Sequence, residues 1–344
     1  MLKHAFKRLL VLLPAVWLIA SVVFLLSKTV PGQASETEFE QAAQSANSRA
    51  KNEAYQRAYR QMLHRTGQDL PLFYFRLGSK AETNPPHPSS SDNLWPEFFW
   101  YGTENQYHRW FKNLLHGDLG VSNRDSRAVT EIVAEAFAVT WWLAVVAFVL
   151  IAVLAPEIAM VLSRKSNRTW RSWLLNALYG LESIPLFVLA LLVLTFSSYA
   201  GWLYDFPEEV SRGLVIFCLV LVNLPYLTGQ AYAAMQTTLQ ENYVLTARAK
   251  GLPDKMVLRK HVLRNSLLPV ITLLSDFFPA LLAGTVMLEV IFSVPGMGRL
   301  LVSSVLTRDY EVITGIVLLV GVLKMLSHLL ADLLYAVTDP RINR

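Results

Sequence analysis

The stretch TARAKGLPDKMVLRKHVLRNSLLP, residues 246–269, is strongly basic and joins two of the most apolar segments of the chain. It contains six Lys or Arg residues and one acidic residue, whereas residues 213–235 and 267–292 carry few charges. A basic loop between two apolar segments resists translocation across a bilayer and stays on the cytoplasmic side. The stretch therefore predicts an integral membrane protein with this loop in the cytoplasm.

Composition also indicates a membrane protein. Of the 344 residues, 53% are hydrophobic and 17% are charged, whereas soluble domains average about 25% charged residues. Basic cytoplasmic loops account for the net charge of +5, so nucleic-acid binding is not expected. The single cysteine, Cys218, excludes an intrachain disulfide and a cysteine-based zinc cluster. Neither an H-E-x-x-H metal motif nor a G-x-x-x-x-G-K-[ST] phosphate loop occurs, so we expect no cofactor, metal or enzymatic site.

Six apolar stretches are long enough to cross a bilayer, at about 1.5 Å per residue and a hydrocarbon core of about 30 Å. The first is longer than the 7–15 apolar residues usual in a cleaved signal peptide, which favours an uncleaved span over that alternative. Five of the six contain a proline, which membrane helices tolerate when neighbouring groups satisfy the freed carbonyls. The expected spans are residues 9–26, 136–162, 173–197, 213–235, 267–292 and 312–337.

The short loops indicate the orientation of the spans. With a cytoplasmic N-terminus, three, four, six and two Lys or Arg residues lie in the inner segments 1–8, 163–172, 236–266 and 338–344. The short outer loops, 198–212 and 293–311, contain only Arg212, Arg299 and Arg308. This bias of fifteen to three follows the positive-inside rule, so we expect a multi-pass protein with both termini in the cytoplasm.

Residues 33–131 differ from the rest because they are polar and carry charges of both signs. Their aromatic clusters are not typical of a disordered tail, which predicts a small folded lobe outside the membrane with a flexible loop at 83–93. Residues 38–65 are expected to be helical, because apolar residues recur at helical spacing without Pro or Gly. The expected domains are 1–32 with the first span, 33–131 as the lobe, and 132–344 as a five-helix core with the loop at 236–266.

The basic stretch has the pattern of two short helices. Residues 243–250 contain no helix breaker, and Gly251 follows where a helix C-terminal cap belongs. Pro253 suits the first turn of a second helix, which is expected to end near Asn265 before Pro269 begins the next span. Small residues beside the glycine would let another protein approach closely. The alternative is a loop that lies on anionic lipid headgroups.

Several motifs recur in one order along the chain. They are LLHGDLGVS at 114–122, SIPLFVLALL at 183–192, YVLTARAKGL at 243–252, LRNSLLPV at 263–270, LEVIFSVPGMGRLLVSSVLTRDY at 288–310 and DLLYAVTDPRINR at 332–344. Together they resemble the dipeptide, oligopeptide and nickel permeases of ABC importers, in the subunit type with a large first outer loop. The resemblance covers residues 1–32 and about 110–344, and residues 33–110 match nothing in that family.

The resemblance implies an all-α permease of six transmembrane helices in the bacterial cytoplasmic membrane, with a large extracytoplasmic insertion after the first helix. It implies as partners a second permease, identical or homologous, two ATP-binding subunits below, and an outer substrate-binding protein. The general importer signature begins E-A-A, but Leu245, Thr246 and Ala247 stand there, so docking is expected to survive without the acidic contact. The expected ATPase-coupling residues are Tyr243, Thr246, Ala247, Arg248, Ala249, Lys250, Gly251 and Leu252.

Charges within spans are functional hypotheses, because each costs about 2.5–3.5 kcal/mol at a helix centre. Glu289 matches a family position near the end of its span, where interfacial water would lower that cost, and is expected to be structural. An ion pair between Lys324 and an acidic residue is favoured over a contact with substrate. Gly296 and Gly298 predict a tight outer turn. The resemblance implies a re-entrant or interfacial segment there, so residues 292–300 are expected to gate the outer mouth, and an ordinary loop is the alternative. The candidate pathway or gate residues are Glu182, Asp276, Glu289, Pro295, Gly296, Gly298 and Lys324.

The expected function is that of a permease subunit without its own ATPase, which translocates peptides or a similar small solute. Dipeptides, oligopeptides, nickel chelates and cationic peptides are all open as substrates, in either direction of transport. One alternative is an ion-coupled secondary transporter, which predicts paired broken helices in two repeat halves. The other is a membrane sensor or assembly protein whose outer lobe binds a partner without any ATPase.

Overall fold

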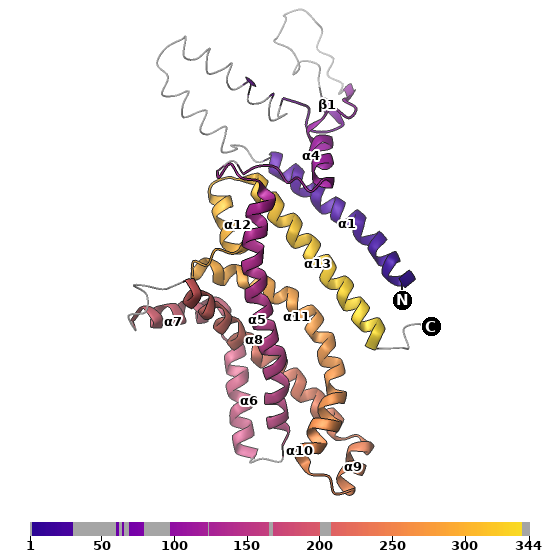
Figure 1. The fold of residues 1–344 in the computed structure, drawn as a ribbon, viewed down its shortest axis with the longest axis vertical. Coiled ribbons are helices and arrows are strands. Elements are labelled where there is room, and N and C mark those ends of the chain that lie inside the picture. The colour runs from indigo at the N-terminus through magenta and orange to yellow at the C-terminus, as the bar shows by residue number, and fades with distance from the viewer. Residues whose placement is uncertain are drawn as a thin grey trace, which may run out of the picture. The chain divides into compact units, whose positions relative to one another are not determined.

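Most of the described chain is helical (Figure 1). The computed structural model describes residues 2–29, 60–61, 64, 69–78, 97–122, 124–164, 168–199 and 208–338. Every expected apolar stretch coincides with helix. The long helices are α1 (Leu2–Thr29), α5 (Val129–Ser163), α6 (Arg168–Glu182), α7 (Leu186–Tyr199), α8 (Glu208–Leu239), α11 (Arg264–Ile291) and α13 (Tyr310–Thr338).

The third apolar stretch is not one straight helix, contrary to the simplest expectation. It is divided into α6 and α7, which are bent by 95° relative to each other. The break falls at Ser183, Ile184 and Pro185. Proline has no backbone N–H, clashes with the carbonyl four residues earlier and disfavours helical dihedrals in the residue before it. These constraints explain why the helix ends before Pro185 and begins again after it.

By length and composition, three described helices could cross a membrane: Val129–Ser163, Glu208–Leu239 and Tyr310–Ser327. The bent pair α6 and α7 adds a fourth if it forms one broken span. The parts of α1 and α11 whose side chains are described form shorter apolar segments, Pro14–Lys28 and Phe277–Ile291, and α12 (Met297–Leu306) is a third. The described residues thus supply three or four spans by this measure, fewer than the six expected.

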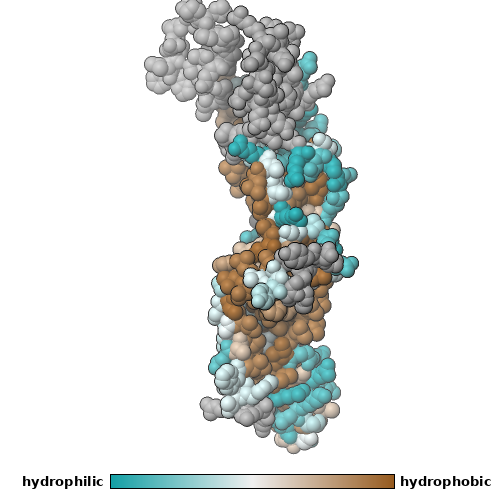
Figure 2. All heavy atoms as spheres, turned by 90° about the vertical axis from the view of Figure 1, so that its left-hand side faces the viewer, coloured by the Kyte–Doolittle hydropathy of each residue, from teal (hydrophilic) through white to brown (hydrophobic). Residues whose placement is uncertain are grey.

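The chain divides into two compact units. The larger unit comprises residues 1–20, 133–303 and 316–344, and one cluster of buried residues from α5, α7, α8, α9, η2 and α11 forms its core. Its outer surface is also apolar, and Figure 2 shows hydrophobic side chains over the middle of these helices, with hydrophilic residues at the end that carries α9 and α10. Such a large exposed apolar surface is rare in soluble proteins and fits contact with lipid.

The smaller unit comprises residues 21–132 and 304–315. Strands β1 (Phe75–Gly78) and β2 (Glu97–Trp100) pair antiparallel, and α4 (Gln106–Leu115) follows them. The Asn105 side chain caps α4 by accepting a hydrogen bond of 2.7 Å from the His108 backbone N–H. Aromatic rings around Tyr107 pack these parts together. The helix expected at 38–65 and the loop expected at 83–93 lie outside the described residues, apart from residues 60, 61 and 64.

The basic stretch forms α9 (Asn242–Ala249), α10 (Asp254–Met256) and the wider π-helix η2 (Val257–Leu263), which continues into α11. The first short helix is confirmed. The expected end of the second helix near Asn265 is wrong, because the chain is helical without a break from Asp254 to Ile291. Pro269 removes one backbone hydrogen bond without ending the helix, as membrane helices tolerate. The second part of the loop, α10 and η2, therefore forms one continuous helix with α11.

Candidate functional site

Gly251 ends α9 in the expected way. Its φ is +78°, a left-handed conformation that glycine adopts without the penalty of a Cβ atom. The Gly251 N–H donates to the Arg248 carbonyl at 2.9 Å, and the Leu252 N–H donates to the Ala247 carbonyl at 3.4 Å. This pair of bonds is the Schellman motif, which satisfies carbonyls that the helix end would leave unpaired. The glycine therefore fixes the angle at which the chain leaves α9.

One face of this loop packs into the protein. Val244 and Ala247 of α9, and three residues of η2, are buried in the same core cluster as residues of α5 and α8. Ala247 is 6% exposed, so its small side chain lets α9 lie close to the protein's own core. Close packing of this kind transmits displacement, because protein interiors have low compressibility. The loop is therefore anchored on the core helices.

The opposite face of α9 is free for contact. The exposed side chains include Tyr243, Leu245, Thr246, Ala249 and Lys250. Next to them lies a shallow depression of about 470 Å³, lined by Pro253, Lys255, Met256, Arg259 and Lys260. This face combines exposed apolar side chains with basic ones, which is suited to a protein surface that carries acidic groups.

Two further contacts hold the loop residues in place. The Tyr243 hydroxyl accepts a hydrogen bond of 2.8 Å from the Asn265 side-chain amide, which ties α9 to the start of α11. Arg248 pairs with Asp254 across the glycine turn at 3.4 Å. Because both partners are partly exposed, that pair contributes little to stability.

A second site surrounds the carboxylate of Glu289, near the other end of α11. Glu289 is fully buried. One carboxylate oxygen accepts a bond of 2.7 Å from the Thr140 hydroxyl of α5, and the other accepts one of 2.7 Å from the Gly298 backbone N–H. The Thr140 hydroxyl in turn accepts a bond of 2.9 Å from the Met297 N–H. We name Glu289, Thr140 and residues 294–298 the carboxylate clasp.

The expectation that interfacial water lowers the cost of Glu289 is wrong. The side chain is 0% exposed, and protein donors take the place of water. These donors matter because a buried charge or polar group without partners is strongly unfavourable. Sequence inspection missed Thr140, whose only signal is a hydroxyl within an apolar run.

Both glycines of the clasp are required by close packing. A Cβ atom on Gly296 would come within 2.3 Å of the Glu289 carboxylate carbon, and one on Gly298 within 2.4 Å of the Val286 backbone. The sequence predicts a tight turn here, and residues 292–296 do form one before α12 (Met297–Leu306) begins. Gly298 lies inside α12, so the structure assigns it a packing role.

Of the other candidate pathway residues, Pro295 lies in the turn of the clasp, but it is exposed. Glu182, Asp276 and Lys324 lie outside the clasp, and Glu182 is exposed at the end of α6. Asp276 lies in α11, but its side chain is outside the described part of the chain. Lys324 lies on α13 and lines a cavity of about 430 Å³ together with residues of α5, α11 and α12. Thr140 and Met297 also line this cavity, so it adjoins the clasp.

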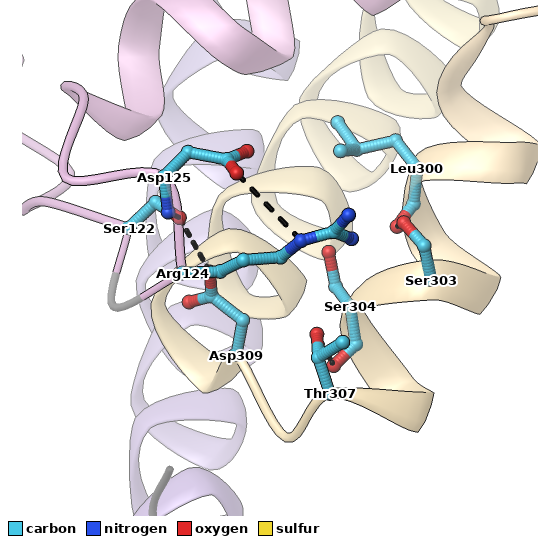
Figure 3. Close-up of polar contacts among 8 residues, drawn as sticks. All are labelled: Ser122, Arg124, Asp125, Leu300, Ser303, Ser304, Thr307 and Asp309. Carbon is cyan, nitrogen blue, oxygen red and sulfur yellow. Dashed lines mark hydrogen bonds and ion pairs between the residues drawn. The ribbon is translucent and has the colours of Figure 1, made fainter. Parts of the chain in front are cut away.

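Two of the sequence motifs meet in the smaller unit. Ser122, the last residue of LLHGDLGVS, donates a hydrogen bond of 2.6 Å to Asp309 of the TRDY segment (Figure 3). Both side chains are 2% exposed. Lys28 approaches Glu311 at 3.5 Å in the same unit. These contacts hold the segment before α5 against the segment before α13, which explains why both motifs carry small or polar residues.

The chain resembles known proteins along its whole length. Residues 157–344 match the family described as "Binding-protein-dependent transport system inner membrane component". The oligopeptide transport system permease protein OppB of Haemophilus influenzae is 31% identical over 352 aligned positions, covering 100% of both chains. The glutathione transport system permease protein GsiC of Pectobacterium atrosepticum is 33% identical over 359 positions, covering 100% of this chain and 99% of the relative.

Proposed function

The chain belongs to the family of binding-protein-dependent transport system inner membrane components, and we propose that it carries peptides or similar small solutes through the membrane while separate subunits hydrolyse ATP. The matched relatives carry oligopeptides and glutathione by name. The single observation that carries the coupling role is the capped α9 turn, which is packed on the core and leads into the unbroken helix from α10 to α11.

The proposed assembly contains this subunit, a second permease that is identical or homologous, two ATP-binding subunits and an outer substrate-binding protein. In it, α1, α5, the α6–α7 pair, α8, α11 and α13 are the six spans, with both termini in the cytoplasm. Residues 33–131 form the outer lobe, and 132–344 form the permease core with its loop at 236–266. The positive-inside bias and the apolar surface of these helices support this arrangement.

The proposed coupling surface is the exposed face of α9 with the depression beside it. The sequence names Tyr243, Thr246, Ala247, Arg248, Ala249, Lys250, Gly251 and Leu252. Ala247 of this set is buried beside Val244, so we assign contact with the ATPase to the exposed members. Closure of the ATP-binding subunits would then push on a face that cannot yield without moving the core.

Helix α11 offers a direct route from this loop to the carboxylate clasp. The 25 residue steps from Arg264 to Glu289 correspond to roughly 38 Å of helix at about 1.5 Å per residue. A tilt imposed at η2 would therefore displace Glu289 relative to Thr140 and the turn at 294–298. We propose that the clasp holds the outer turn in one state and releases it when α11 moves, which makes residues 292–300 an outer gate.

The assembly is tested by purification. When the tagged chain is extracted in mild detergent, two ATP-binding subunits are expected to co-purify, and the reconstituted complex is expected to take up peptide only with ATP. The measurements are the subunit ratio and uptake of labelled peptide into proteoliposomes. Purification without any ATPase, combined with uptake driven by an ion gradient, would contradict the proposal and support a secondary transporter.

The orientation is tested by labelling. In a Cys218→Ala background, a cysteine replacing Lys255 is expected to react with a membrane-impermeant maleimide only after the cells are permeabilised. The matched control is Tyr199→Cys at the end of α7. This side chain is 95% exposed, and the proposed topology places it outside the membrane. Labelling of the Lys255→Cys chain in intact cells would place the loop on the wrong side and end the coupling proposal.

A further inference from the structure

The cavity beside the clasp has the dimensions of a site for a small molecule. Its volume is about 430 Å³, and ligand sites in proteins commonly measure about 300–1,000 Å³. Four helices supply its walls. The lining residues are Phe137, Thr140, Pro279, Ala280, Leu282, Ala283, Val286, Met297, Leu301, Ile316, Val320, Leu323, Lys324 and Ser327.

Lys324 is the charged member of this lining. The two hydroxyl groups of the wall already have partners, since Thr140 belongs to the clasp and Ser327 donates to the Leu323 carbonyl at 2.9 Å. The Lys324 ammonium makes no hydrogen bond or ion pair with any side chain in the part of the structure that is described, and it is exposed. The wall therefore presents one cation on an otherwise apolar surface.

The position of this lysine makes a solvated surface role unfavourable. Lys324 is 14 residues from either end of α13, which is about 21 Å along the helix axis in each direction at about 1.5 Å per residue. A lysine at the centre of a membrane helix costs about 2.5–3.5 kcal/mol, and such residues usually face a cavity or a partner. An anionic group in the cavity would therefore give the Lys324 ammonium a partner of opposite charge.

We propose that Lys324 binds a carboxylate of the transported solute while the apolar walls accept its side chains. This inference rests on the proposed function and names the chemical feature that the pathway recognises. Peptides and glutathione-like thiol peptides all end in a carboxylate, and an ammonium–carboxylate contact is a strong, charge-assisted hydrogen bond. A compact, flexible ammonium also suits a site that must bind and then release its ligand.

The competing partner is Asp276. This residue precedes Pro279, Ala280 and Ala283 of the cavity wall by three, four and seven positions on α11, which places it on the same helix face. An ion pair with Asp276 would neutralise Lys324 without involving the solute. The two cases differ in one measurable respect, because only a contact with solute depends on the charge of the solute.

The test compares a tripeptide with its C-terminal amide in the reconstituted complex. Concentrations are chosen to give equal ATP-dependent uptake by the wild-type complex, so that any preference of the binding protein cancels. Lys324→Met is expected to lower uptake of the free acid about tenfold relative to the amide, because only the acid loses a charge-assisted hydrogen bond. Lys324→Arg is expected to keep most of the uptake of the acid.

The control is Leu326→Met, which changes the same helix outside the cavity wall and is expected to leave both peptides unaffected. Equal loss of acid and amide in Lys324→Met, or recovery of acid uptake in Lys324→Met combined with Asp276→Asn, would overturn the inference in favour of an internal ion pair. In both outcomes the wild-type complex still carries peptide. Absence of ATP-dependent uptake in the wild-type complex would instead overturn the proposed function and the inference with it.

Discussion

Replacing Gly298 by alanine is expected to destabilise the chain by about 3–5 kcal/mol, in the range observed when a buried charge loses its partner. A Cβ atom at this position would lie 2.4 Å from the Val286 backbone, and backbone cannot move aside as a side chain can. The resulting shift of α12 would withdraw the Gly298 N–H from the Glu289 carboxylate. The measurements are thermal unfolding of the purified protein in detergent and its abundance in the membrane.

Gly213→Ala is the matched control for this substitution. Gly213 lies in α8, and an added Cβ atom would meet nothing within 4 Å. Alanine is a better helix former than glycine by about 1 kcal/mol, so this variant is expected to be as stable as the wild-type protein or slightly more so. Equal stability of Gly298→Ala and Gly213→Ala would show that the clasp is not closely packed.

Replacing Gly251 by valine is expected to uncouple transport, with ATP-driven uptake reduced about tenfold or more. A β-branched residue at φ of +78° is strained, by about 1–2 kcal/mol for a left-handed L-residue, and 1.36 kcal/mol corresponds to a factor of ten. The Schellman cap would open, and α9 would lose its fixed angle to α10. Uptake per permease molecule in the membrane is the quantity to measure, together with ATP hydrolysis by the assembled complex.

Gly251→Asn provides the control, because asparagine adopts left-handed backbone conformations more readily than other residues with a Cβ atom. This variant is expected to retain most of the uptake, since the space around Gly251 is open. The comparison separates backbone strain from side-chain bulk. Wild-type uptake by Gly251→Val, with the protein present at normal abundance, would rule out a rigid α9 turn as the coupling element.

The glycine turn after α9 was predictable because its determinants are local. A helix without breakers, followed by glycine and then proline, fixes backbone geometry within a few residues, and the observed cap agrees with it. The bend of 95° between α6 and α7 was only half predictable. Pro185 marks where a helix is interrupted, but the angle depends on what the two pieces pack against.

The sequence alone determined the membrane class, the helical segments, the family motifs and the glycine cap, because apolar runs, basic loops and left-handed positions are properties of short stretches. Only the tertiary structure decided what Glu289, Gly296, Gly298 and Thr140 do. Thr140 is 149 positions from Glu289 in the chain, and no local pattern connects them. The physical reason is that burial and hydrogen bonding are set by whichever helices come together, so a charge expected beside water is instead held by protein donors.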